Sequence, residues 1–209
     1  MKAIVFGATG NVGRLAVETM LKEGHEVTAF ARHPGTLKTS DPKLTLHAGD
    51  AFDAASVDAA VRGHNAVVIT LGAGASRKSL IRSQGTMNVI QAMQKNGVRR
   101  LICQSTLGAH ESWDNLDFFW KRIMFGLILR LVFRDHELQE KLVRASGLDW
   151  TIVRPSAFAD GPASGGFKED FGPETRKLKL SIPRADIAAF LSRQLCDRKY
   201  LHRAVAISN

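Results

Sequence analysis

The sequence contains few cysteines, and they are not arranged to form a metal site or a network of disulfides. Its two cysteines, Cys103 and Cys196, lie far apart and lack zinc-like spacing, which argues against either arrangement. The N-terminal stretch MKAIVFGATG lacks the basic flank and long apolar core of a signal peptide. We therefore expect the protein in the reducing cytoplasm.

Long uncharged apolar runs are also missing. The most apolar segment, residues 116–133 (LDFFWKRIMFGLILRLVF), is interrupted by Lys121, Arg122 and Arg130. Its longest uncharged run, residues 123–129, is far shorter than the ~20 residues that span a bilayer, so we expect no membrane partner. The segment is either a helix buried on most of its surface, or a flap or subunit contact beside the active site. We favour the buried helix, although periodicity alone does not separate the two.

Clusters of basic residues are absent despite a formal net charge of +9. The lysines and arginines are scattered in runs no longer than two, without the interleaved aromatic residues of a nucleic-acid interface. The pattern therefore disfavours DNA or RNA binding. A charge of this sign fits an anionic small ligand or simple solubility equally well.

The sequence does contain apolar strand-like runs that alternate with helical stretches along the 209 residues. Strands that are apolar throughout and separated by helices indicate a parallel sheet buried on both faces. We predict an α/β fold, a single-domain Rossmann-type doubly wound sheet over residues 1–209, with small substrate-side segments near 111–134 and 157–182. The expected strands are 2–6, 26–31, 44–47, 66–71, 99–104, 150–153 and 204–207, and the expected helices are 12–23, 53–62, 79–96, 134–145 and 186–196.

Three glycines follow the first expected strand, at Gly7, Gly10 and Gly13 of the stretch VFGATGNVG. The G-x-x-G-x-x-G spacing differs from the usual G-x-G-x-x-G, but its physical requirements are the same. Gly7 permits a sharp turn, Gly10 permits close approach of a pyrophosphate, and Gly13 permits tight helix packing. The amides near Asn11 and Val12 would then face an anion at the helix N-terminus. With a strand before and a helix after, the pattern predicts dinucleotide binding.

The end of the second expected strand indicates which dinucleotide. NAD-binding proteins place an acidic residue here on the ribose hydroxyls, whereas an arginine accommodates a 2′-phosphate. This sequence reads VTAFARHPGT, with Arg32 at that place and no acidic residue until Asp41. A planar guanidinium binds a phosphate with two hydrogen bonds. We therefore predict NADP(H), with NADPH preferred over NADH; the alternative is an ordinary surface arginine.

Four stretches together resemble a known superfamily: GATGNVG, HAGDAFD, GTMNVIQAMQKNGVRRLICQST and RASGLDWTIVRPSAF. They resemble the atypical short-chain dehydrogenase/reductases, within the NAD-dependent epimerase/dehydratase superfamily. The closest likeness is to the small NAD(P)H-binding members, namely the flavin reductase/biliverdin-IX-beta reductase group and the NmrA-like proteins. The likeness covers almost the whole chain, and it implies that the cofactor lies at the carboxyl ends of the strands.

The resemblance assigns expected roles by position. The pyrophosphate turn matches Gly7, Thr9, Gly10, Asn11 and Val12, and the 2′-phosphate contact matches Arg32. The adenine contact matches Asp50 and Ala51, although Asp50 also suits a simple turn after Gly49. The loop beside the adenosine ribose matches Leu71 and Gly72.

The catalytic residues of the superfamily are only partly present. The Tyr-x-x-x-Lys pair of the catalytic short-chain dehydrogenases is absent, because Val132 and His136 occupy its places and the only tyrosine is Tyr200. The serine of the flavin reductase group matches Ser105, whereas its catalytic histidine falls at Ala157. His136 matches a histidine on the substrate side of that group. Ser105 and His136 are therefore the catalytic candidates; alternatively, Ser105 caps a strand and His136 is an ordinary surface or half-buried residue.

Three functions remain open at this stage. The first is an NADPH-dependent oxidoreductase that reduces a flavin, a quinone or a similar planar acceptor, as a monomer or weak homodimer. The second is a non-catalytic NADP(H)-sensing regulator of the NmrA type, suggested by the missing Tyr, Lys and His. An epimerase or dehydratase acting on a nucleotide sugar is disfavoured, since it needs the tyrosine base and a larger substrate domain.

Overall fold

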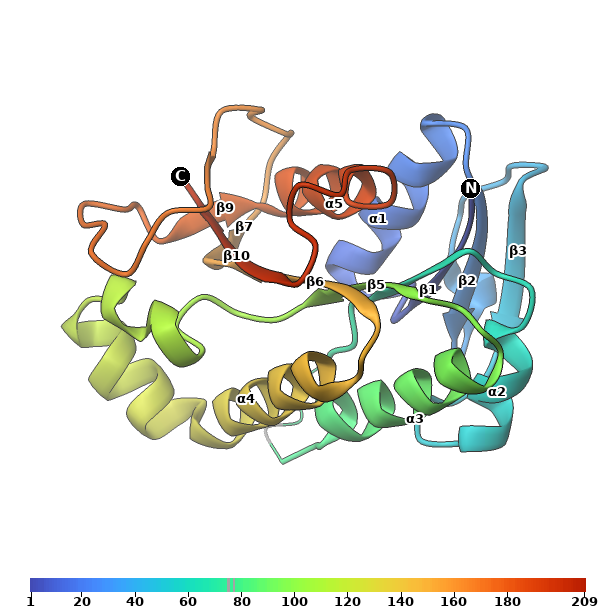
Figure 1. Cartoon of the computed structure of the whole chain (residues 1–209). Helices are drawn as coiled ribbons and strands as arrows, with labels where there is room; N and C mark the ends of the chain where they lie inside the picture. Colours follow the sequence, from blue (N-terminus) through green and yellow to red (C-terminus); the bar gives the residue numbers. More distant parts are fainter. Residues whose placement is uncertain (75, 77) are drawn as a thin grey trace.

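The computed structural model describes residues 1–74, 76 and 78–209. Its centre is a sheet of eight strands in the order β3-β2-β1-β4-β5-β6-β10-β8, in which only β8 runs antiparallel to its neighbour (Figure 1). A separate two-stranded parallel sheet joins β7 to β9. The strands are β1 Lys2–Phe6, β2 Glu26–Ala31, β3 Leu44–Ala48, β4 Ala66–Ile69, β5 Arg100–Gln104, β6 Asp149–Pro155, β7 Ala157–Ala159, β8 Lys168–Glu169, β9 Ser181–Pro183 and β10 Arg203–Ser208.

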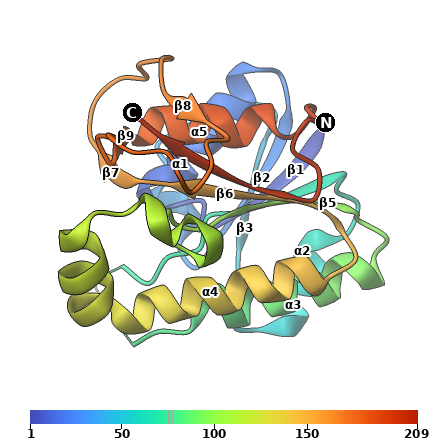
Figure 2. The same ribbon diagram turned by 60° about the vertical axis from the view of Figure 1, so that its left-hand side comes forward.

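Helices cover both faces of this sheet. Figures 1 and 2 show α1 and α5 on one face and α2, α3 and α4 on the other. The α-helices are α1 Asn11–Lys22, α2 Ala54–Val61, α3 Ile81–Lys95, α4 Arg130–Ala145 and α5 Arg184–Arg193. Two short 3₁₀ helices, η1 Pro34–Thr36 and η2 His110–Asn115, and a π-helix, η3 Phe119–Ile128, complete the described elements. The predicted doubly wound α/β fold is confirmed.

Side-chain alternation along β1 explains the two layers. Ala3 and Val5 belong to the core under α1 and α5, whereas Ile4 and Phe6 belong to the core under α2, α3 and α4. All four are fully buried, because successive side chains of a strand point to opposite faces and both faces are covered. The expected elements all form, with ends displaced by a few residues. For example, the helix expected at 79–96 spans Ile81–Lys95, and the one expected at 134–145 already begins at Arg130.

The segment 116–133 is where the sequence-based prediction was wrong. It forms the π-helix η3 and the first turn of α4, and it is not buried on most of its surface. Phe118 and Leu127 are each 74% exposed, and Ile123 and Leu131 are exposed as well. Apolar residues occur on every side of this segment, so its pattern does not identify the face that packs. Only one side contacts the protein, through Trp120, Phe125, Leu129 and Phe133.

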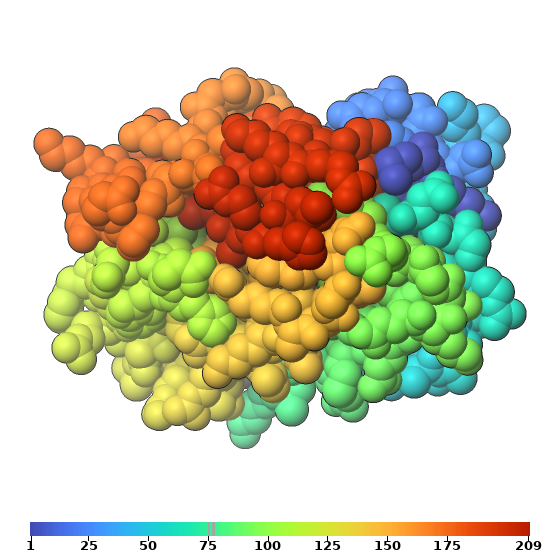
Figure 3. Space-filling view, viewed as in Figure 1, coloured from blue at the N-terminus to red at the C-terminus, as the bar shows by residue number. Residues whose placement is uncertain are grey.

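That packed side contributes to a third, smaller core at one end of the molecule. Phe125 and Phe133 stack with ring centroids 4.6 Å apart, and the cluster includes Leu180 and Phe171 from the 157–182 segment. Asn115 Nδ2 ties the two segments together by donating to the carbonyl oxygens of Gly172 (2.8 Å) and Thr175 (3.2 Å). Figure 3 shows the orange 157–182 segment lying against the yellow-green segment on this face.

Candidate functional site

A cavity of about 710 Å³ lies at the carboxyl ends of β1 to β5. It opens where the strand order reverses between β1 and β4, which is the place where doubly wound folds bind ligands. All the binding and catalytic candidates named from the sequence line it. The lining residues that the site argument uses are Gly7, Thr9, Gly10, Asn11, Val12, Arg32, Asp50, Ala51, Thr70, Leu71, Gly72, Arg82, Gln104, Ser105, His136 and Phe158.

The glycine turn at the mouth of the cavity has no room for side chains. Gly7 has φ +83°, a left-handed conformation, and a Cβ there would lie 2.6 Å from the carbonyl oxygen of Thr70. A Cβ on Gly13 would lie 2.2 Å from the carbonyl oxygen of Gly7. The predicted turn and tight helix packing are therefore present. The Thr70 side chain also stabilises this turn, because its Oγ1 donates to the Phe6 carbonyl oxygen at 3.0 Å.

The N-terminus of α1 faces the cavity with an uncapped first turn. Its N-cap residue is Gly10, which provides no side-chain cap, and the first turn contains no acidic residue. Backbone amides at such a position lack intrahelical acceptors and carry the positive end of the helix dipole. Thr9, Gly10 and Asn11 are exposed beside them. The turn therefore fits a pyrophosphate, because it is exposed at the cavity and no side-chain cap occupies the first amides of the helix.

Arg32 follows directly after β2 and lines the same cavity. Its side chain is exposed, and it forms no ion pair with the residues that the structure describes. It is thus a surface arginine at the rim of the cavity, available to an anion. The sequence-based role at a 2′-phosphate stays a prediction.

Asp50 and Ala51 form the wall of the cavity after β3. Asp50 Oδ1 accepts a hydrogen bond from the amide of Phe52 at 3.0 Å, so the turn-forming role considered from the sequence is real. No hydrogen bond to its other carboxylate oxygen occurs among the described residues, and the predicted adenine contact stays a prediction. Asn88 of α3 holds this turn by donating to the carbonyl oxygens of Ala51 (2.9 Å) and Phe52 (3.1 Å). Asn88 lies in the stretch GTMNVIQ, but the sequence did not indicate this role.

Leu71 and Gly72 lie in the loop after β4, as expected. Leu71 packs closely on α3, where a Cβ on Gly85 would lie 2.7 Å from Leu71 Cδ1. Gly72 is exposed at the cavity. Their proposed contact with the adenosine ribose stays a prediction.

Ser105 and His136 are both buried residues of the cavity lining, and the part of the cavity that they line is called its inner end. Ser105 is 1% exposed, and its Oγ has no hydrogen-bond partner among the described residues, so it does not cap the strand end. His136 of α4 is 9% exposed, and its Nδ1 likewise lacks a partner in the described chain. Burial, together with the nearby positive charge of Arg82, lowers the pKa of His136 to about 3. The imidazole is therefore neutral at pH 7, and it is neither a surface nor a half-buried residue.

Three further lining residues of the cavity, Gln104, Arg82 and Phe158, were missed from the sequence. Gln104 Oε1 is enclosed without a hydrogen-bond partner among residues 1–74, 76 and 78–209. Arg82, near the start of α3, and Phe158 of β7 also line the cavity. Buried polar atoms are normally paired, so several unpaired ones around one cavity indicate groups that a ligand satisfies. The position of Gln104 and Ser105 at the end of a parallel strand was the available signal.

Two catalytic places of the superfamily hold residues without acid–base chemistry: Val132 at the tyrosine place and Ala157 at the histidine place of the flavin reductase group. Val132 is half-buried outside the cavity lining, and Ala157 is a half-buried residue of β7. Tyr200 is fully buried in the core under α1 and α5, and its hydroxyl donates to Glu169 at 2.9 Å. No tyrosine is therefore placed to act as a base at this cavity.

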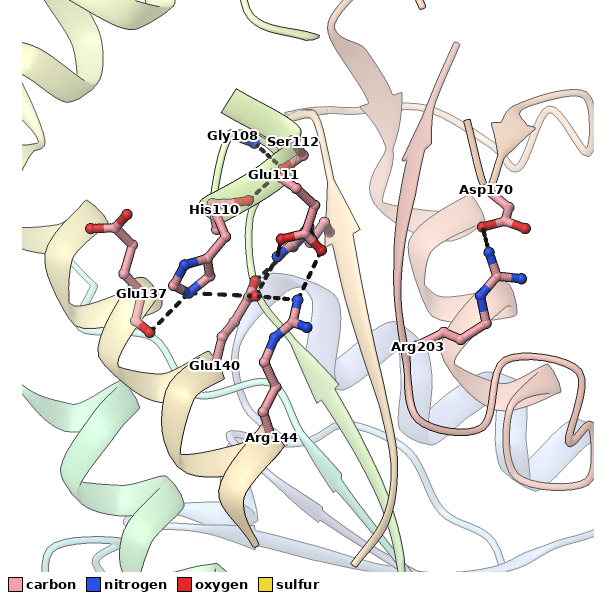
Figure 4. A network of polar contacts seen from close by, with 11 residues as sticks. Gly108, His110, Glu111, Ser112, Glu137, Glu140, Arg144, Asp170 and Arg203 are labelled. Carbon is pink, nitrogen blue, oxygen red and sulfur yellow. Dashed lines mark hydrogen bonds and ion pairs between the residues drawn. The ribbon is translucent and has the colours of Figure 1, made fainter. Parts of the chain in front are cut away.

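A buried ion-pair network fixes the helix that carries His136. Arg154 of β6 donates from Nε to Glu140 Oε1 at 2.8 Å and from one Nη to Glu140 Oε2 at 2.5 Å, and Glu140 lies one turn after His136. Figure 4 shows Glu111, Glu140 and Arg144 drawn together, with Arg144 donating to Glu111 at 2.9 Å. The network binds α4 to the sheet and to η2, and so it positions the inner wall of the cavity.

The described residues lack two other features. They contain no group of three or more His, Cys, Asp or Glu side chains that could hold a metal ion. Within the same part of the chain, none of the helices is both long enough and apolar enough to cross a membrane.

Three known proteins are similar to this chain over nearly its whole length. An uncharacterized chloroplastic protein of Arabidopsis thaliana is 27% identical, covering 99% of this chain and 76% of its own. The crystal structure of ChuY, an anaerobilin reductase from Escherichia coli O157:H7, is 26% identical, covers 100% of this chain and 97% of its own, and superposes with a TM-score of 0.82. A short-chain dehydrogenase/reductase of Veillonella parvula in complex with NADP, at 16% identity, shares the fold with a TM-score of 0.84 and covers 100% of this chain and 94% of its own.

The family comparison agrees with the geometry of the glycine turn. The model of the NAD(P)H-binding family matches residues 7–198, which include the whole cavity lining and every strand of the eight-stranded sheet except β1 and β10. The chain therefore belongs to the NAD(P)H-binding family.

Proposed function

We propose that the protein is an NADPH-dependent oxidoreductase that reduces a flavin or a similar planar acceptor. The observation that carries this proposal is the inner end of the cavity, where the Ser105 hydroxyl and His136 Nδ1 are buried without partners. Such atoms are costly to leave unpaired in a protein interior, and a substrate held beside the cofactor would pair them. The similarity to an anaerobilin reductase supports a reductase in general.

Different residues of the cavity would bind different parts of the cofactor. The uncapped α1 N-terminus and the glycine turn would hold the pyrophosphate, and Arg32 would hold the 2′-phosphate that distinguishes NADPH. A bound nicotinamide supplies the hydride, which an oxidised planar acceptor takes with little acid–base assistance. The protein then contributes mainly position and exclusion of water. Ile81 and Phe158 provide apolar lining for a planar ring.

Ser105 and His136 act here as hydrogen-bonding groups. The depressed pKa of His136, lowered by burial, means that it does not provide a proton from an imidazolium at neutral pH. Neutral imidazole still has one donor and one acceptor nitrogen, and the serine hydroxyl donates and accepts as well. Both suit the polar edge of a heteroaromatic acceptor or the carboxamide of the cofactor.

A second candidate is a non-catalytic NADP(H)-sensing regulator of the NmrA type. The observation that favours it is the absence of a titrating acid or base at the inner cavity: Ala157 stands in the histidine position, and the pKa of His136 is about 3. Such a protein would bind the cofactor and turn nothing over.

One paired measurement separates the two. NADPH oxidation is followed by absorbance with FMN, riboflavin and a water-soluble naphthoquinone, while NADPH and NADP⁺ affinities are measured by calorimetry on the same preparation. Turnover with any acceptor, together with micromolar or tighter cofactor binding, supports the reductase. Binding without turnover favours the regulator, and absence of binding contradicts both.

A further inference from the structure

Arg82 presents a positive charge to the inner cavity that the chain itself does not neutralise by hydrogen bonds. It is the second residue of α3, its side chain is 13% exposed, and it lines the cavity with Ser105 and His136. Its Nη2 faces the loop after β4, where a Cβ on Gly72 would lie 3.9 Å from it. The guanidinium therefore borders the space beside the candidate catalytic residues.

The guanidinium lacks hydrogen-bond acceptors in the described structure. Its Nε and Nη1 are enclosed and have no partner among the residues described. The nearest carboxylate, Asp135, has Oδ2 3.9 Å from Nη1, beyond hydrogen-bonding distance. Guanidinium groups stay charged in proteins, so this is a largely buried cation with unfilled donors, an arrangement that costs free energy until an acceptor arrives.

Asp135 already accepts hydrogen bonds from the first residues of α3. Its carboxylate accepts from the amide of Arg82 at 3.2 Å, from the amide of Ser83 at 3.1 Å and from Ser83 Oγ at 2.5 Å. It thereby caps the first turn of α3, whose own N-cap residue, Leu80, has no side chain that can do so. Because its oxygens are used there, Asp135 balances part of the Arg82 charge without filling its donors.

Other charges around the cavity do not replace that missing acceptor. Among the described lining residues the acidic one is Asp50, which is bound in the turn after β3 on the adenine side. Arg32 stands at the end of β2 and is also cationic. The inner end of the cavity therefore has a positive potential in a partly enclosed space, where an ionic contact is stronger than at an open surface.

We propose that Arg82 binds an anionic oxygen group of the substrate, so that the acceptor is a planar molecule bearing a carboxylate or a phosphate. This rests on the proposed function in one respect, that the substrate occupies the inner end of the cavity. A guanidinium forms paired, charge-assisted hydrogen bonds with either anion, and it would orient the planar part between Phe158 and the Ser105–His136 edge. A neutral quinone would leave the donors unfilled and bind more weakly.

The test uses binding, so that it does not depend on turnover. NADP⁺-saturated protein is titrated calorimetrically with 2-naphthoate, 2-naphthyl phosphate and the neutral 2-naphthamide, which share one planar ring system. We expect one or both anions to bind at least tenfold more tightly than the amide. The stronger of the two identifies carboxylate or phosphate as the preferred group.

Matched variants assign that preference to Arg82. Arg82→Met should abolish the tenfold preference and Arg82→Lys should retain part of it, because a charge remains without the paired donors. Arg122→Met, an exposed residue outside the cavity lining, should retain the full preference. Thermal unfolding of each variant, and its NADP⁺ affinity, show whether the fold and the cofactor site are intact.

Three outcomes overturn the inference: equal binding of all three probes, no binding of any probe, or a preference that survives in Arg82→Met. A loss of NADP⁺ affinity in that variant, with the anion preference unchanged, would instead assign Arg82 to the cofactor. The proposed function fails separately. If no acceptor is reduced while the anion preference depends on Arg82, the protein has an anion site beside its cofactor but is not a reductase.

Discussion

The carbonyl oxygen of Gly7 lies in the space that the side chain of residue 13 would occupy. A Cβ on Gly13 would be 2.2 Å from that oxygen and 2.7 Å from Thr70 Oγ1. The first strand, the first helix and the end of β4 therefore meet at one point. This contact sets how closely the α1 N-terminus approaches the sheet, and with it the position of the amides proposed to bind the pyrophosphate.

Replacing Gly13 by alanine tests this contact. Alanine favours a helix, but here its methyl group meets backbone that cannot shift cheaply, so we expect a loss of about 1–3 kcal/mol in the free energy of unfolding. Urea denaturation measures it. The control is Gly35→Ala, where a Cβ would have no neighbour within 4 Å, and its effect should stay within about 0.5 kcal/mol. Equal effects of the two changes would contradict the packing argument.

The Glu140–Arg154 pair gives a second prediction. Both side chains are almost completely buried, at 0% and 2% exposure, so Arg154→Met removes both hydrogen bonds of a buried carboxylate. Glu140 then keeps only its longer contacts with Arg144, at 3.7 Å, and His110, at 3.9 Å. We expect a loss of about 3–5 kcal/mol in the free energy of unfolding, measured by denaturant titration.

Two further variants make that measurement specific. The double variant Arg154→Met/Glu140→Leu should recover much of the lost stability, because no buried charge remains. Arg99→Met breaks the exposed Arg99–Asp149 pair, 3.0 Å long, and should cost less than about 1 kcal/mol. Similar losses in Arg99→Met and Arg154→Met would show that burial does not control the effect.

The fold was predictable from the sequence because its signals are local. Buried parallel strands are apolar on both faces, as in β1, and glycines mark the ends of helices and strands, so each element shows within a short window. The packing of the 116–133 segment was not predictable, because its local pattern is ambiguous: its apolar residues allow several faces to pack. The contact with Leu180 and Phe171 selects one face, and it comes from residues far along the chain.

The candidate site likewise contains residues that local sequence signals identify and residues that they do not. Gly7, Gly10 and Gly13 were identifiable because the turn needs them at fixed spacing beside a strand. Arg82 was not, since nothing in its neighbourhood distinguishes it from a solvent-exposed helical arginine. Its burial depends on α4, which brings Asp135 and His136 against the start of α3 from more than fifty residues away. Such a juxtaposition is visible only in the folded chain.

His136 gives a prediction about pH. Burial lowers its pKa from 6.5 to about 3 in the folded protein, so below pH 6.5 the unfolded chain takes up a proton that the folded protein does not. Stability therefore falls as the pH drops from 6.5 toward 3. By pH 4.5 the loss from this residue amounts to about 2–3 kcal/mol.

The measurement is the free energy of unfolding between pH 7 and pH 4.5 for wild type and His136→Gln. The difference between the two should shift by that amount across the interval, because the variant lacks the titrating group. His33→Gln, at an exposed position, is the control and should follow the wild-type profile. Parallel profiles for wild type and His136→Gln would contradict a buried neutral imidazole.

Replacing Ser105 tests whether its hydroxyl binds a ligand or stabilises the fold. Its Oγ has no partner among the described residues, so Ser105→Ala should leave the free energy of unfolding unchanged or raise it slightly. The buried Ser112 instead accepts from the amide of Gly108 at 2.9 Å and donates to the carbonyl oxygen of Ala109 at 2.8 Å. Ser112→Ala should cost about 1–3 kcal/mol.

In kinetics the order of the two changes should be opposite: Ser105→Ala should have the larger effect and Ser112→Ala the smaller one. With an acceptor that the protein reduces, Ser105→Ala should lower kcat/KM about tenfold, as expected for one lost hydrogen bond to a ligand. Ser112→Ala should leave kcat/KM near the wild-type value at temperatures where it stays folded. A stability loss in Ser105→Ala without a kinetic effect would place this hydroxyl in the fold instead of the site.

Arg32 tests the preference between the two nicotinamide cofactors. A guanidinium that binds the 2′-phosphate contributes about 1.5–3 kcal/mol, so Arg32→Ala should raise the Kd for NADPH by about 10- to 150-fold. NADH lacks that phosphate, and its Kd should not change. Arg14→Ala removes another exposed arginine, which belongs to α1 and lies outside the cavity lining, and it should alter neither Kd by more than about twofold. Calorimetry of both cofactors with the three proteins decides the question: if wild type binds NADH as tightly as NADPH, or Arg32→Ala weakens both alike, Arg32 does not select the phosphorylated cofactor.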